Sequence, residues 1–124
     1  MAEIRDPLHA FDDAVIEAVA RERDFEVQTL RDLVRKQQEV VRSLPGVDDI
    51  VYEWRKAFAT DPLVECRPDA YYLSVPGHVW PEFASSLSAS SEELNAVRAV
   101  HDRQFRAVLG DVGGDTDALV LTRP

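Results

Sequence analysis

Side chains able to bind a metal ion or attack a substrate are few among the 124 residues of this sequence. They are one cysteine, Cys66, and three histidines, His9, His78 and His101. Their spacing matches no metal-binding motif, and one cysteine cannot form an internal disulfide. Cys66 lies in a segment with strand character, where a cysteine usually acts as a small apolar group. We therefore expect no metal site and no cofactor.

Adjacent carboxylates, which could act as general acid and base, occur at Asp12-Asp13, Asp48-Asp49 and Glu92-Glu93. Each pair lies near the expected start of a helix, where the helix dipole favours acidic side chains without any catalytic role. The sequence has no G-x-S-x-G nucleophile motif. Gly113-Gly114 lacks the preceding strand and following helix of a phosphate-binding loop. These patterns predict that the protein is not an enzyme.

The amino-acid composition of the whole sequence is unusual. The net charge is −9, arginine far outnumbers lysine, which occurs only at Lys36 and Lys56, and valine far outnumbers isoleucine. This acidic composition resembles that of proteins from extreme halophiles with GC-rich genomes, which implies a potassium-rich surrounding. An ordinary acidic protein from a GC-rich bacterium is the alternative. At about 1 M salt the Debye length is ~3 Å, so the charge would not exclude a polyanionic partner.

The halophile interpretation makes a measurable prediction. At low salt the negative charges repel one another and destabilise the compact state. The melting temperature should therefore rise strongly between about 0.1 and 2 M potassium chloride, as the Debye length falls to ~3 Å and below. A melting temperature that stays constant over this range, followed by circular dichroism, would contradict the interpretation.

The elements that must position these side chains follow from hydrophobic periodicity. The pattern predicts a mainly helical α+β fold in a single domain, residues 1–124. We expect helices at 7–20, 25–43, 48–59 and 91–109, a β-hairpin at 63–75 and a short last strand at 118–122. The run Arg21 to Asp24 shifts the frame of the apolar stripe, which favours two helices over one continuous helix in residues 7–43, although the pattern leaves both open.

The sequence also bears on location. No apolar run approaches the ~20 residues needed to cross a bilayer. The acidic start MAEIRDPLHAFDD lacks the basic and apolar regions of a signal peptide. We expect a cytoplasmic protein that has no membrane partner.

The middle of the sequence combines a helix, a break at Leu44-Pro45-Gly46, an acid-capped helix that contains Trp54-Arg55-Lys56, and a hairpin. The hairpin has a Leu63-Val64 strand, the charged turn Arg67-Pro68-Asp69 and an aromatic strand. Residues 27–75 thus resemble the winged helix-turn-helix of many prokaryotic regulators, a resemblance of pattern rather than of a fixed motif. It implies a winged-helix-like fold and binding of double-stranded DNA.

The resemblance also implies roles for individual residues. The 48–59 helix would lie in a major groove. Its outward side chains Tyr52, Arg55 and Lys56 would reach bases or phosphates, Arg42 would contact the DNA backbone, and Arg67 would reach a phosphate or the minor groove. On the same helix, Trp54 and Phe58 are expected in the core.

The 91–109 helix corresponds to the dimerisation helix that many such regulators carry. Its apolar stripe predicts a homodimer interface formed by Leu94, Val97, His101, Phe105 and Val108. The first functional hypothesis is thus a dimeric DNA-binding transcriptional regulator. The alternative is a small helical dimeric scaffold or adaptor without catalytic activity. A small enzyme or ligand-binding domain is a third hypothesis.

Overall fold

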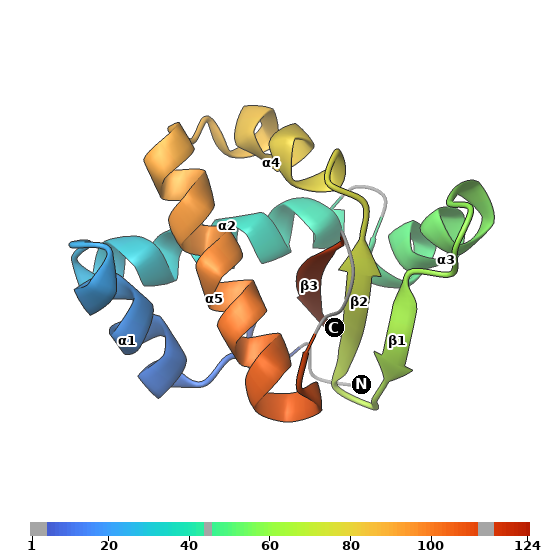
Figure 1. Ribbon diagram of the computed structural model, residues 1–124, viewed down its shortest axis with the longest axis horizontal. Helices are drawn as coiled ribbons and strands as arrows, with labels where there is room; N and C mark the ends of the chain where they lie inside the picture. The colour runs from blue at the N-terminus through green and yellow to red at the C-terminus, as the bar shows by residue number, and fades with distance from the viewer. Residues whose placement is uncertain (1–4, 44–45, 112–115) are drawn as a thin grey trace.

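The computed structural model describes residues 5–43, 46–111 and 116–124, and it confirms the mainly helical α+β class. In these residues the chain forms five helices and one three-stranded antiparallel sheet (Figure 1). The helices are α1 (Asp13–Glu22), α2 (Val27–Ser43), α3 (Val47–Ala57), α4 (Val79–Leu87) and α5 (Ser91–Leu109). The strands are β1 (Leu63–Cys66), β2 (Ala70–Val75) and β3 (Asp117–Thr122).

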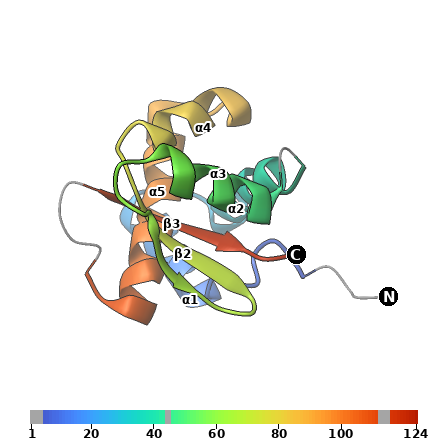
Figure 2. The same cartoon turned by 90° about the vertical axis from the view of Figure 1, so that its right-hand side faces the viewer.

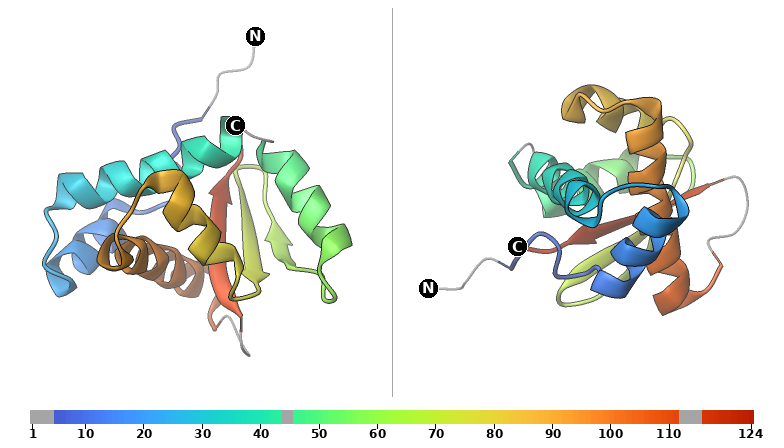
Figure 3. Two further views of the ribbon diagram at one scale, coloured as in Figure 1. Left: turned by 90° about the horizontal axis from the view of Figure 1, so that it is seen from above. Right: turned by 90° about the vertical axis from the view of Figure 1, so that its left-hand side faces the viewer.

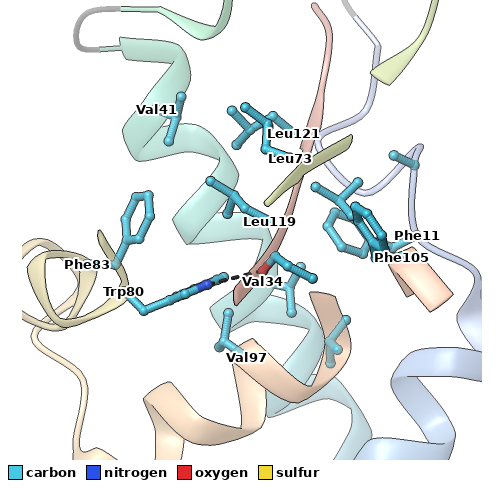
Figure 4. Packing of buried hydrophobic residues seen from close by; sticks show 14 of the residues in the cluster. Phe11, Val34, Val41, Leu73, Trp80, Phe83, Val97, Phe105, Leu119 and Leu121 are labelled. Carbon is cyan, nitrogen blue, oxygen red and sulfur yellow. Dashed lines mark hydrogen bonds between the residues drawn. The ribbon is translucent and has the colours of Figure 1, made fainter. Parts of the chain in front are cut away.

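The sheet has the order β1-β2-β3, so the hairpin expected at 63–75 is extended by the last strand of the chain. Side chains alternate between the two faces of the sheet. On one face, Tyr72 packs against Phe105 of α5, with ring centroids 6.2 Å apart. On the other face, Leu121 points toward Val41 of α2 (Figure 4). Helices therefore bury both faces of β2 and β3.

The helices divide the molecule into two ends. Helix α3 lies beside β1 at one end, whereas α1, α4 and α5 lie together at the other (Figures 1 and 3). Seen from the α3 side, α1 and α5 are behind the sheet (Figure 2). The structure thus separates β1 and α3 from the helices that form most of the core.

The first expected helix differs from the structure at its start. Residues 7–10 form a turn, and α1 begins at Asp13. The reason is that other groups satisfy the backbone here: the Asp6 carboxylate accepts from the Leu8 N–H at 2.8 Å, and the Thr122 hydroxyl donates to the Pro7 carbonyl at 2.8 Å. Helices α1 and α2 are separate, with Asp24 between them in the left-handed region at φ 59°.

The outer edge of β3 has its hydrogen-bonding groups occupied by buried side chains. The Gln38 amide donates to the Val120 carbonyl at 2.9 Å and accepts from the Thr122 N–H at 2.8 Å. The Val120 N–H donates to His101 Nδ1 at 2.9 Å, and the Trp80 indole donates to the Ala118 carbonyl at 3.2 Å. Buried backbone groups need such partners, so these three side chains take the place of a fourth strand.

Candidate functional site

The exposed face of α3 carries the residues that the sequence assigns to DNA. Val51 packs into the core and Trp54 lies against it, so Tyr52, Arg55 and Lys56 are turned outward. Trp54 and Phe58 are only partly buried and stack on each other, with centroids 6.0 Å apart. The expected core positions on α3 are therefore at the margin of the core rather than inside it.

The two cations of this face each have an acidic neighbour. Arg55 makes a two-pronged contact with Asp61, at 3.0 Å from Nη2 and 3.1 Å from Nε. These hydrogen bonds hold the pKa of the Asp61 carboxyl below its ordinary value. Lys56 Nζ lies 3.5 Å from Glu53 Oε1 and 4.5 Å from the centroid of the Tyr52 ring. A phosphate would have to compete with these contacts.

The other two expected DNA contacts lie elsewhere. Arg67, at the hairpin turn, pairs with Glu65 and lies 5.4 Å over the Tyr72 ring. Arg42, on α2, is half-buried, and burial lowers the pKa of its guanidinium. No hydrogen bond or ion pair in the described part of the chain links Arg42 or Arg67 to the α3 residues. Tyr52, Arg55 and Lys56 therefore share one helix face, whereas Arg42 and Arg67 come from α2 and the hairpin turn.

The first turn of α3 is acidic. Asp48 was expected to cap this helix, but the N-cap is Gly46 at φ 115°, and Asp48 and Asp49 lie inside the first turn. The Asp48 carboxylate instead accepts a hydrogen bond from the Tyr71 hydroxyl. Burial and this bond raise the pKa of Tyr71 to about 12. In a winged-helix arrangement this turn would lie nearest the DNA, where its carboxylates repel phosphates.

The expected dimer interface on α5 needs a correction. Leu94, Val97, His101 and Phe105 are buried inside the single chain, and Val108 is partly buried against the same core. His101 lies between the rings of Phe11 and Trp80, at centroid distances of 4.9 and 4.8 Å. This stripe is covered by the chain's own α1, α4 and sheet, so it is not a surface for a second copy.

The sequence reasoning missed a group of arginines on the opposite face of α5. Arg98, Arg103 and Arg106 line a groove of about 600 Å³, together with Arg23 at the end of α1. The spacing of Arg98, Asp102 and Arg106 places them on one helical stripe, which is the signal that could have found them. Arg23 is far away in sequence and could not be joined to them without the fold.

Two classes of site have no counterpart in the described residues. Within 5–43, 46–111 and 116–124, no group of three histidine, cysteine or acidic side chains could hold a metal ion. None of the helices in these ranges is long and apolar enough to cross a membrane. Gly113-Gly114, considered as a phosphate loop, lies outside the described residues.

Comparison with known proteins identifies a family. Residues 9–123 match the model of a family described as a domain of unknown function (DUF8048), and the chain belongs to this family. No curated protein and no solved structure matches the chain. Function therefore has to be argued from the geometry.

Proposed function

We propose that the protein is a non-catalytic binding module that assembles as a homodimer through α3 and β1. The observation that carries this proposal is the position of the exposed large hydrophobic side chains. Among the described residues these are Tyr52 on α3, 61% exposed, and Val64 on β1, 54% exposed. Both side chains belong to the end of the molecule formed by α3 and β1, where exposed apolar groups make this end a candidate interaction surface.

The charges around these two side chains favour a second copy as the partner. Each acid of the pairs Arg55–Asp61, Lys56–Glu53 and Arg67–Glu65 lies beside a base on the exposed surface. A two-fold interface brings a surface against itself, so where that surface is charged it must carry both signs. Such a patch can exchange its internal ion pairs for pairs across the interface.

The positions of the paired carboxylates support binding rather than catalysis. Asp13, Asp48-Asp49 and Glu92-Glu93 all lie in the first turns of helices. The helix dipole stabilises them there. Their arrangement therefore needs no acid–base chemistry.

Sedimentation velocity in concentrated potassium chloride tests the dimer. We expect the wild type to sediment as a dimer at micromolar concentration. The variants Tyr52→Asp and Val64→Lys should sediment as folded monomers, and Thr29→Lys, an exposed change on α2, should leave the dimer intact. A monomeric wild type, or dimers in all variants, would contradict the proposed interface.

A second candidate function is DNA binding, which the order α2, turn, α3 and hairpin favours together with the shared exposed face of Tyr52, Arg55 and Lys56. The acidic first turn of α3 would repel DNA, and Arg55 and Lys56 are already paired with acids. DNA binding is therefore the weaker of the two candidates. In this case Lys56→Ala should lower the salt slope of binding by about one ion. Arg55→Ala should relax preference at one base position, at about 1–3 kcal/mol.

DNA binding is tested by measuring how much double-stranded genomic DNA the protein retains at several potassium chloride concentrations. Loss of retention in the Arg55→Ala/Lys56→Ala variant, with normal thermal stability, would support DNA binding. Equal retention by wild type and variant, or no retention by the wild type, would contradict it. The sedimentation experiment is independent of this outcome.

A further inference from the structure

We propose that the groove between α1 and α5 binds a small organic anion with more than one phosphate or carboxylate group. This site uses none of the residues of the α3–β1 surface, so it is independent of the function proposed above. It would make the protein a module that responds to a small molecule as well as to a macromolecular partner.

The groove has the size of a ligand site. Its volume is about 600 Å³, inside the range of about 300–1,000 Å³ in which small molecules bind. Val19 of α1 and Ala99 of α5 form part of its apolar lining, and Ala118 closes it at the start of β3. All three positions lie in helices or in a strand, whereas Arg23 lies in the turn that follows α1.

The charge of the lining differs from that of the rest of the protein. Four arginines line the groove against three acidic residues, which leaves one positive charge, whereas the whole chain carries −9. One third of all arginines in the sequence are gathered here: Arg23, Arg98, Arg103 and Arg106. A local excess of positive charge in an acidic protein favours an anion at this place.

Three of these arginines are held in place by acids. Arg98 Nη2 lies 3.0 Å from Asp117 Oδ1, and Arg103 pairs with Glu22. Arg106 Nε lies 2.9 Å from Asp102, one turn earlier on α5. Arg106 Nη1 also lies 2.6 Å from Asp111 Oδ1. A guanidinium has five N–H donors, so one or two carboxylates leave other donors free. The ion pairs therefore orient the arginines without using all of their hydrogen-bonding capacity.

Arg23 is the arginine best placed to respond to a ligand. Its side chain is exposed and makes no ion pair within the described part of the chain. It also lines a smaller adjoining hollow of about 390 Å³ with Phe25, Glu92 and Asn95. Arg23 therefore stands between two connected hollows, with Arg103 on the facing helix.

The arginines specify the chemical class of the ligand. The planar guanidinium fork matches the paired oxygens of phosphate and carboxylate groups. Because the arginines come from two helices, a ligand with two or more anionic groups can contact both sides of the groove at once. A ligand with one charge would gain less from the same lining.

Calorimetric titration of the full-length protein with pyrophosphate and, separately, with citrate tests the site. Both titrations are made at one ionic strength set by potassium chloride. We expect at least one of the two anions to bind the wild type. In the Arg23→Gln/Arg103→Gln variant the dissociation constant should rise by about tenfold or more, which is the loss of about one charge-assisted contact. Arg21→Gln removes an exposed charge from the same helix outside the groove and should change binding by less than about twofold.

The possible results are decisive in both directions. Binding of pyrophosphate alone would identify phosphate groups as the ligand chemistry, and binding of citrate alone would identify carboxylates. The proposal would be overturned if neither anion binds at about 10 mM. A dissociation constant above that concentration corresponds to a binding free energy weaker than ~3 kcal/mol. A free-energy loss in the double variant no larger than twice the loss in Arg21→Gln would also overturn the proposal, because the double variant removes two charges and only the net charge would then matter. Circular dichroism confirms that each variant is folded.

Discussion

The two edges of the sheet differ in the environment of their polar groups. At β3, the edge groups are hydrogen-bonded by Gln38, His101 and Trp80, and all three side chains are buried. At β1, Val64 and Cys66 are exposed, Leu63 and Glu65 are partly buried, and charged side chains form surface pairs such as Arg67–Glu65. Buried polar groups are costly to leave unpaired, whereas exposed ion pairs contribute about 0–1 kcal/mol. The β3 edge is therefore fixed by structure, and the β1 edge is available for interactions.

The β1 edge is protected in a different way from the addition of a strand of another molecule. The strand has four residues, is flanked by Pro62 and Pro68, and its register shifts between Leu63 and Glu65. Short strands, prolines and bulges all hinder the addition of a further strand. A partner on this side is thus expected to contact side chains of α3 and β1 rather than to extend the sheet.

The largest effect that distinguishes the edges is expected at Gln38. Replacing Gln38 by Leu keeps the side-chain size but leaves the Val120 carbonyl and the Thr122 N–H buried without partners. At about 1–3 kcal/mol for each group, the variant should lose about 3–5 kcal/mol of unfolding free energy, measured by urea denaturation. Gln28→Leu, an exposed change on the same helix, should stay within about 0.5 kcal/mol. A loss below about 1 kcal/mol for Gln38→Leu would show that the edge is not sealed in this way.

How far the sequence predicts this fold depends on the range of the interactions. The helix expected at 91–109 coincides with α5, because local signals set its ends: the Ser90–Glu93 capping box at the start and Gly110 at the finish. The hairpin was equally predictable from its alternation and its turn. By contrast, the pattern places Gln38 simply on a helix, and its bonds to β3 join residues far apart in sequence. Such contacts cannot be read from periodicity.

The functional residues show the same limit. An apolar stripe predicts that a helix face is buried, but it does not tell whether the same chain or a second copy buries it. This is why Leu94 and Phe105 were assigned to an interface and are found in the core. The exposed positions of Tyr52, Arg55 and Lys56 followed correctly from the helical period, but their acidic partners Glu53 and Asp61 required side-chain geometry.

A smaller effect is expected from the pH response of His101. Complete burial lowers its pKa to about 3, from an ordinary value of 6.5. As the pH falls, the unfolded chain takes up the proton at a higher pH than the folded chain does. The contribution of neutral His101 to the free energy of unfolding is therefore fully present above pH 6.5 and is lost as the pH falls toward 3. Between pH 7 and pH 5, the wild type should lose about 2 kcal/mol more than His101→Gln, in which Gln can still accept from Val120. Urea denaturation at both pH values measures the difference, and equal losses would contradict a buried neutral histidine.

The contact between α3 and the central strand of the sheet should have a still smaller effect. The hydrogen bond from Tyr71 to Asp48 ties β2 to α3, and Tyr71→Phe should cost about 1–2 kcal/mol. The raised pKa of about 12 means that this contribution is present below the ordinary value of 10 and is lost as the pH rises through 12. An absorbance titration should therefore lose its highest-pH phenolate step in Tyr71→Phe. Retention of that step would assign it to another tyrosine and contradict the bond.

The smallest change in unfolding free energy is expected for substitutions on the exposed face of α3. It contrasts directly with the large loss expected at the buried Gln38. Arg55→Ala and Lys56→Ala remove side chains whose polar contacts within the described residues are with Asp61, Glu53 and the Tyr52 ring. Exposed substitutions of this kind change stability by within about 0.5 kcal/mol, since water and salt replace the lost ion pairs. Urea denaturation in low and high potassium chloride should give the wild-type midpoint for both variants. A loss of more than about 1.5 kcal/mol in either would show that α3 depends on its surface pairs for folding, and these side chains could then no longer be regarded as free to serve a partner.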